Sequence, residues 1–165
     1  GSSAEAKVVK GSGKTTVAFT AKGPAGMTIG GASSALNLRD DGKTLVVSVP
    51  LQPFTTGIAL RDKHMREKYL EVDKFPVAEV VIERSALRLQ AAGTTSVDAK
   101  GLLKLHARSK VVSFHINTQA HGGTIQVVGT ARIDLRDFGI QVPSFLGVTV
   151  KPEIDIVASF DAKDV

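Results

Sequence analysis

Hydrophobic and polar residues alternate with a period of two along most of the chain, which is typical of strands that bury one face. In segment 44–51, for example, Leu45, Val47 and Val49 fall on one side. Similar segments occupy residues 15–20, 35–38, 80–83, 97–107, 112–117, 125–135 and 154–161. The pattern therefore predicts about eight strands joined by short polar turns.

One segment has a helical period. Residues 56–70 place Met65 and Tyr69 at helical spacing, which predicts a single amphipathic helix with Thr55 or Thr56 as its cap. No second helical segment could supply the crossovers that parallel strands need, so the strands are expected to pair antiparallel, in a closed barrel or a sandwich. A barrel with an apolar interior suits strands that each have one apolar face. The predicted fold class is all-β with one inserted helix.

The composition fits one globular domain. The chain has 165 residues, of which 42% are hydrophobic, enough to bury a core. We expect residues 6–165 to form this domain, and residues 1–5 to be a cloning remnant or a disordered start from which a signal peptide has been removed. The absence of cysteine excludes disulfides and thiolate zinc sites.

The charge balance favours an anionic partner. Lysine and arginine number 21 against 16 aspartates and glutamates, a net charge of +5, which suits nucleic acid, a membrane surface or an anionic ligand. Lys7, Lys10, Lys14 and Lys22 lie in a stretch without acidic residues. Aromatic residues make up only 5% and do not interleave with these lysines, which argues against nucleic acid. An anionic membrane surface or head group is the remaining expectation.

The motifs do not favour enzymatic chemistry. Residues 11–16, GSGKTT, are similar to part of a phosphate-binding loop, but Val8 stands where that motif needs its first glycine. The histidines lack the spacing of zinc ligands, and the strand positions of His106 and His115 predict surface side chains. A hydrolase that uses the histidines is a further alternative, but the sequence has no Gly-x-Ser-x-Gly elbow to support it. We predict no enzyme, no cofactor and no metal site.

Three motifs, in order along the chain, resemble the YceI-like family. Residues 56–76, TGIALRDKHMREKYLEVDKFP, are similar to the family's hallmark of Thr-Gly, Arg-Asp, a histidine followed by methionine or leucine, and a final proline. Residues 101–106, GLLKLH, resemble one of its strands, and residues 136–140, RDFGI, resemble a third signature. The resemblance covers about residues 45–160, whereas the first 40 residues depart from the family pattern.

The resemblance implies an extended, lipocalin-like barrel of eight antiparallel strands with the helix over one end. It also implies non-enzymatic binding or transport of a polyisoprenoid, an isoprenoid quinone or a similar long amphiphilic lipid inside the barrel of a bacterial protein. A periplasmic or secreted location and a homodimer are further expectations, and a cytoplasmic location stays open.

Candidate ligand contacts follow from this interpretation. Methionine and phenylalanine fill an irregular channel adaptably, and the lipid tail is expected to contact Phe19, Met27, Val47, Phe54, Met65, Tyr69, Leu103, Phe114, Phe138 and Phe145. Arg61 and His64 are the candidate contacts of the polar head. The rival interpretation is a barrel filled by its own side chains, acting as a structural or protein-interaction module. The number of strands does not distinguish the two.

Overall fold

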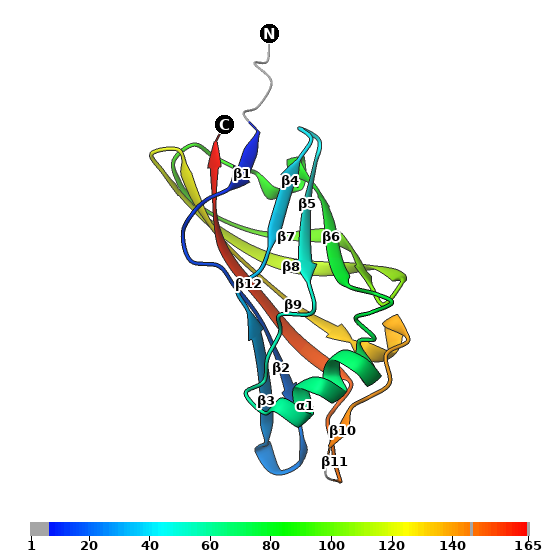
Figure 1. Ribbon diagram of the computed structural model, residues 1–165. Helices are drawn as coiled ribbons and strands as arrows, with labels where there is room; N and C mark the ends of the chain where they lie inside the picture. The colour runs from blue at the N-terminus through cyan, green and yellow to red at the C-terminus, as the bar shows by residue number, and fades with distance from the viewer. Residues whose placement is uncertain (1–6, 146, 165) are drawn as a thin grey trace.

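The fold is described from a computed structural model, which covers residues 7–145 and 147–164 (Figure 1). Strands account for most of these residues: β1 (Val8–Lys10), β2 (Thr16–Lys22), β3 (Thr28–Ser33), β4 (Asn37–Asp40), β5 (Thr44–Pro50), β6 (Val77–Glu83), β7 (Gly93–Leu105), β8 (Arg108–His121), β9 (Thr124–Asp134), β10 (Ser144–Phe145), β11 (Val148–Thr149) and β12 (Glu153–Asp164). Helical turns are few: η1 (Pro24–Gly26), α1 (Ala59–His64), η2 (Met65–Tyr69), α2 (Arg84–Leu87) and η3 (Leu135–Phe138).

Nine strands form one continuous antiparallel sheet in the order β3-β2-β12-β9-β8-β7-β6-β5-β4, and β1 pairs with the end of β12. The sheet curls strongly into a half-barrel, with β3 toward the end that carries α1 and β4 toward the end with the chain termini (Figure 1). The all-β class and the antiparallel pairing are confirmed. The expected closed barrel of eight strands is not observed. The sheet has nine strands and is a half-barrel, because no ladder joins its two edge strands, β3 and β4, within the described chain.

Two local contacts hold the edges of the curled sheet together. Near the chain ends, the backbone N–H of Val8 in β1 donates to Asp40 Oδ2 of β4 at 2.9 Å. Toward α1, Ala32 and Thr55 exchange two backbone hydrogen bonds of 3.0 and 3.1 Å. The curl of the sheet is therefore held by a few hydrogen bonds at its two ends, without a continuous ladder between its edge strands.

The inserted helix lies across the end of the sheet opposite the chain termini (Figure 1). Its α-helical part, α1, continues into the π-helical turn η2, so the helix spans 11 residues, 59–69, within the predicted range 56–70. The expected threonine cap is wrong, because Ile58 occupies the N-cap position. The hydroxyls of Thr55 and Thr56 instead donate to the carboxylate of Asp62.

The inner face of the sheet carries the core. In β8, every second residue from Val112 to Ala120 is buried, and the residues between them are exposed. The buried residues are Val112, Phe114, Ile116, Thr118 and Ala120. A period of two combined with strong curl brings such faces from all sides of the sheet to a common interior. The predicted facing of this strand is confirmed.

Candidate functional site

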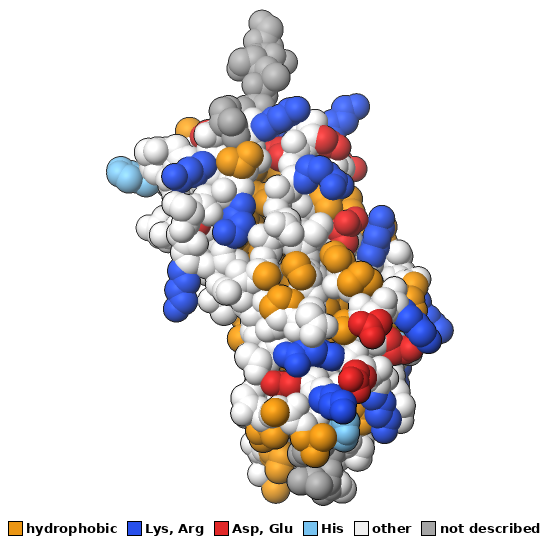
Figure 2. Space-filling model, in the orientation of Figure 1, with side chains coloured by type: hydrophobic (Ala, Val, Ile, Leu, Met, Phe, Trp, Pro, Cys, Tyr) orange, Lys and Arg blue, Asp and Glu red, His pale blue; other side chains and the backbone are white. Residues whose placement is uncertain are grey.

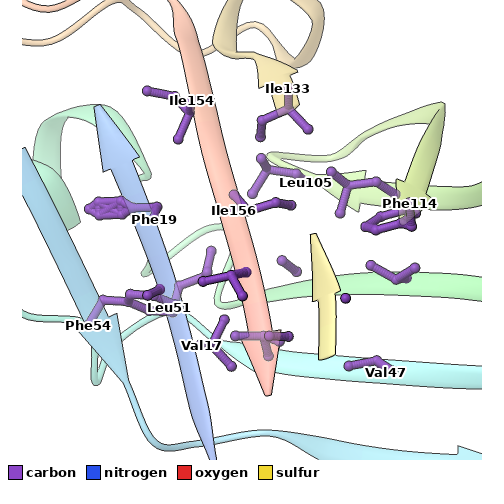
Figure 3. A pocket seen from close by; sticks show the side chains of 18 of the residues that line it. Val17, Phe19, Val47, Leu51, Phe54, Leu105, Phe114, Ile133, Ile154 and Ile156 are labelled. Atoms are coloured by element: carbon purple, nitrogen blue, oxygen red, sulfur yellow. The ribbon is translucent and has the colours of Figure 1, made fainter. Parts of the chain in front are cut away.

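The curled sheet encloses an elongated cavity of about 330 Å³. Side chains from β2, β5, β8, β9 and β12 point into it from different sides (Figure 3). The lining residues that Figure 3 labels are all apolar: Val17, Phe19, Val47, Leu51, Phe54, Leu105, Phe114, Ile133, Ile154 and Ile156. The interior is therefore an apolar chamber of the size that holds a small organic ligand.

Side chains leave this interior partly unfilled. Val17, Val49, Val127 and Ile156 line the cavity, yet they are only half-buried. Residues on the inner face of a sheet that packs its own core are normally buried completely, because protein interiors are close-packed. The half-buried inner face therefore indicates room for a ligand.

Phe19 is fixed at one wall of the cavity by close packing. Its ring meets Phe54 edge to face, with the centroids 5.9 Å apart. On the neighbouring strand, a Cβ at Gly31 would lie only 2.3 Å from the Phe19 ring, so only glycine leaves the space that this ring occupies.

Polar groups gather at one end of the cavity. Thr56, Arg61, His64, Tyr69 and Ser144 line it at the α1 end. At the opposite end, the polar lining residue is Thr118, whose hydroxyl is hydrogen-bonded to Thr95. The cavity is therefore amphipathic along its length, with its ionisable side chains at the α1 end.

A buried carboxylate organises the α1 end. Asp62 is only 5% exposed and accepts hydrogen bonds from Thr55 Oγ1 at 2.7 Å, from the Thr56 backbone N–H at 2.8 Å and from Thr56 Oγ1. Burial raises the pKa of Asp62, but the hydrogen bonds from Thr56 and Thr55 outweigh it and hold the pKa below its ordinary value. The charged carboxylate thus fixes the loop that leads into α1.

Arg61 is positioned by the same threonine. Its Nε donates to Thr56 Oγ1 at 2.8 Å and its Nη2 to the Thr56 carbonyl at 2.9 Å. A guanidinium carries more N–H donors than these bonds use. Arg61 can therefore stay fixed at the cavity wall while it donates to an acceptor inside.

The helix is also tied to the strands around it. Arg66 donates from Nε to the Gln52 carbonyl at 2.9 Å and from Nη2 to the Phe54 carbonyl at 2.7 Å. The Tyr69 hydroxyl donates to the Ser144 carbonyl and accepts from the Ser144 N–H, both at 3.0 Å. These bonds hold η2 beside β10 and beside the segment that follows β5.

We expect Asp62 to make stability depend on acidity. Because its pKa in the folded state lies below the ordinary value of 3.8, its contribution is complete above that pH and is lost as the pH falls through the lowered pKa. The difference in unfolding free energy between the wild type and Asp62→Asn should therefore be largest near neutral pH and shrink on acidification. Urea unfolding at a series of pH values measures it, with the exposed Asp73→Asn as control. A difference that stays constant down to low pH would contradict this role.

Most candidate contacts named from the sequence line the cavity. Those that do are Phe19, Val47, Phe54, Met65, Tyr69, Leu103, Phe114, Arg61 and His64. That they touch a ligand stays a prediction.

Three candidates are placed differently. Met27 follows the turn η1 and is 43% exposed, because the chain reverses there at the rim of the sheet. Phe138 lies in η3 and is buried in the core instead of lining the cavity. The side chain of Phe145 lies outside the described part of the structure.

Sequence reasoning missed Thr56, Pro143, Ser144 and Val148, which also line the cavity. The available signal was the unusually apolar loop over residues 138–147. An apolar loop either packs on the core or borders a cavity, and Pro143 and Ser144 line the cavity.

The two histidines that the sequence placed on strands, His106 and His115, differ in their surroundings. His115 is exposed as predicted, and its ring joins Asp98 Oδ1 at 2.8 Å to Ser96 Oγ at 3.3 Å. This serine–histidine–aspartate chain lies on the outer face of the sheet with the Asp98 side chain 83% exposed. Water screens such an exposed carboxylate and weakens its interaction with the imidazole. Ser96, His115 and Asp98 therefore do not form a buried catalytic triad.

The prediction that His106 is a surface side chain is wrong. It lies in the turn between β7 and β8 with a φ of 55°, and its side chain is only 12% exposed. The ring bonds to Glu71 Oε1 at 2.9 Å and to the Phe138 carbonyl at 3.1 Å, and it packs edge to face on Phe75. His106 therefore links this turn to the segment after the helix.

Within residues 7–145 and 147–164, histidine, aspartate and glutamate side chains form no group of three that could hold a metal ion. None of the helices in that part of the chain has the length and apolar character needed to cross a bilayer.

The family model of the YceI-like domain matches residues 6–162, nearly the whole chain. The chain belongs to the YceI-like family. No curated protein sequence gives a significant match.

Solved structures share the fold of this YceI-like chain at low sequence identity. A polyisoprenoid binding domain from Saccharophagus degradans, described as implicated in plant cell wall breakdown, has a TM-score of 0.81 at 16% identity and covers 98% of this chain and 100% of its own. BcnA of Burkholderia cenocepacia has a TM-score of 0.71 at 16% identity, covering 89% and 95%. The YCEI protein of Campylobacter jejuni has a TM-score of 0.53 at 16% identity, covering 79% and 81%.

Proposed function

We propose that this YceI-like protein binds one long-chain amphiphilic lipid, of the polyisoprenoid or isoprenoid-quinone class, inside the curled sheet and carries it without chemical change. The observation that supports this most is the unfilled apolar cavity, whose ionisable lining residues lie at one end. An apolar tail would lie along the strands, and the polar head would lie beside α1. The similarity in fold to a polyisoprenoid binding domain supports the same class of ligand.

The apolar lining is sufficient for useful affinity. Burial of about 400 Å² of lipid tail contributes about 10 kcal/mol before the costs of ordering the tail. Because this term is non-directional, tight binding does not require strong polar contacts. The head-group contacts then decide which lipid is preferred.

The rival function, a structural module filled by its own side chains, fits the interior less well. Such a module needs inner-face residues that fill the enclosed space. Val17, Val49 and Val127 remain half-buried around the cavity instead.

A carrier of this kind suits the periplasmic or secreted location expected from the family resemblance, and we propose that location with it. Fractionation of cells that express the full-length protein tests the location independently of lipid binding.

Native mass spectrometry of the purified protein tests the proposed function. We expect an adduct with the mass of an isoprenoid lipid, which solvent extraction removes and addition of an isoprenoid quinone restores. Protein that purifies empty and takes up no quinone after extraction would favour the structural module.

Arg61 is expected to select the charge of the head group. A charged guanidinium bonded to a phosphate is a strong interaction, so Arg61→Gln should weaken binding of an isoprenyl phosphate about tenfold, or about 1.4 kcal/mol. Binding of the corresponding uncharged isoprenol should change little. Titration of delipidated protein with both ligands measures the difference. Lys63→Gln, which removes an exposed positive charge from the same helix without lining the cavity, serves as control. Equal losses for the two ligands would show that Arg61 has a structural role only.

A further inference from the structure

Three large hydrophobic side chains are exposed at the α1 end of the molecule. Met27, Ile58 and Leu60 are 43%, 45% and 54% exposed, and none of them lines the cavity. Hydrophobic side chains gather at this end, below α1, and basic and acidic side chains lie above them (Figure 2). Neither the core nor the ligand cavity accounts for these three residues.

The three residues belong to one rim. The backbone bridge between Ala32 and Thr55 joins β3, which begins just after Met27, to the segment that leads into Ile58 and Leu60. The hairpin of β10 and β11 lies at the same rim, because a Cβ at Gly23 would be 3.5 Å from Met27 and 3.6 Å from Val148. Val148 and the neighbouring Ser144 line the cavity, so the exposed rim adjoins its polar end.

The helix at this rim carries more basic than acidic side chains. The helix over residues 59–69 carries Arg61, Lys63, Arg66 and Lys68. Its two acidic residues are Glu67, which is exposed, and Asp62, which is buried against threonines.

Two further lysines lie close together at the same end. Lys22 and Lys151 are both exposed, and the Lys151 N–H donates to the Lys22 carbonyl at 2.7 Å. Exposed apolar side chains next to basic ones are the combination that anionic bilayer surfaces attract.

We infer that this rim, formed by η1, α1 and the β10–β11 hairpin, is a docking surface for an anionic lipid bilayer. Met27, Ile58 and Leu60 enter the boundary between head groups and acyl chains, while the surrounding lysines lie at the level of the lipid phosphates. Docking in this orientation brings the polar end of the cavity to the membrane. The inference rests on the proposed function for its purpose, but the docking itself does not require an occupied cavity.

Co-sedimentation with vesicles tests the inference. The wild type should sediment with vesicles of phosphatidylglycerol and phosphatidylcholine, and at least tenfold less with phosphatidylcholine alone or at high salt. Ile58→Asp with Leu60→Asp should reduce binding to the anionic vesicles at least tenfold. The matched control is Val9→Asp with Val128→Asp, which places the same charges on exposed valines of β1 and β9 and should sediment like the wild type.

The other outcomes separate the two proposals. Quinone uptake from detergent micelles should be unchanged in the Ile58 and Leu60 variant, because neither residue lines the cavity. A wild type that takes up quinone but does not sediment would overturn the docking and leave the proposed function intact. A wild type that sediments with the anionic vesicles but never takes up quinone would overturn the proposed function and leave the docking intact. If light scattering shows a dimer that the same variant abolishes, the rim is an interface between two copies and the docking is wrong.

Discussion

Replacing Asp40 by alanine is expected to lower the free energy of unfolding by about 3–5 kcal/mol. The Asp40 carboxylate forms an ion pair with Arg84, and the two side chains are 0% and 6% exposed. It also accepts hydrogen bonds from the backbone N–H groups of Val8 and Gly42 at 2.9 and 2.8 Å. The substitution removes the carboxylate that faces the buried guanidinium of Arg84 and the backbone of β1. Removing one partner of a buried ion pair destabilises a protein strongly.

The effect should extend to the closure of the sheet. Burial raises the pKa of Asp40, but the bonds from Val8, Gly42 and Arg84 together hold it below its ordinary value, so the carboxylate is charged at neutral pH. Because the Val8 bond joins β1 to the β4 edge, its loss should speed amide hydrogen exchange in β1 before global unfolding.

An exposed ion pair provides the control for Asp40. Asp155 accepts from Arg132 at 2.7 and 3.2 Å, but both side chains are largely in solvent, where such pairs contribute little. Urea unfolding of Asp40→Ala and Asp155→Ala should therefore show a much larger loss for Asp40. Equal losses would mean that the Asp40 contact does not hold the sheet closed.

Filling the cavity is expected to abolish tight lipid binding without unfolding the protein. Val127→Phe places a ring into the cavity from β9, and Val47→Phe does so from β5. A lipid tail that shares the cavity with the two rings overpacks it, which costs about 2 kcal/mol of binding free energy, so the double variant should bind an isoprenoid quinone roughly 30-fold more weakly. Its free energy of unfolding without ligand should stay the same or rise by about 1 kcal/mol, because the new rings occupy empty space.

The neighbouring residue supplies a matched control for the cavity variants. Val128 follows Val127 in β9 but faces outward and is 37% exposed, so Val128→Phe adds the same ring outside the cavity. It should bind the quinone like the wild type. If Val127→Phe and Val128→Phe bind equally well, the lipid does not occupy the interior.

Much of the fold could be predicted from alternation alone. The inward positions of Val112, Phe114 and Ile116 follow from a period of two, because one face of each strand must leave water. Alternation does not determine how tightly the sheet curls or how its edges meet. The contact of Asp40 with Arg84, 44 residues later, depends on that curl and has no local signal.

The alternation of the strands also indicated part of the candidate site, because it shows which side chains face the interior. Strand parity and the helix motif named Phe114, Met65 and Arg61 as ligand contacts, and all three line the cavity; that they contact a ligand stays a prediction. Residue type alone was misleading for Met27, which lies on the exposed rim, and for Phe138, which packs in the core. Whether a phenylalanine faces a cavity or a packed core depends on the space left by its neighbours, which one sequence does not state.

The fluorescence of Tyr69 provides the most direct test of lipid binding in the cavity. The chain has one tyrosine and no tryptophan, and Tyr69 lines the polar end of the cavity, so tyrosine emission reports on that site alone. Delipidated protein titrated with an isoprenoid quinone should lose emission saturably, at one quinone per chain, beyond the loss shown by free tyrosine amide. A short quinone without the isoprenoid tail should quench no more than it quenches the free amide. If the long quinone also quenches Tyr69 no more than it quenches the free amide, the result would contradict binding inside the curled sheet.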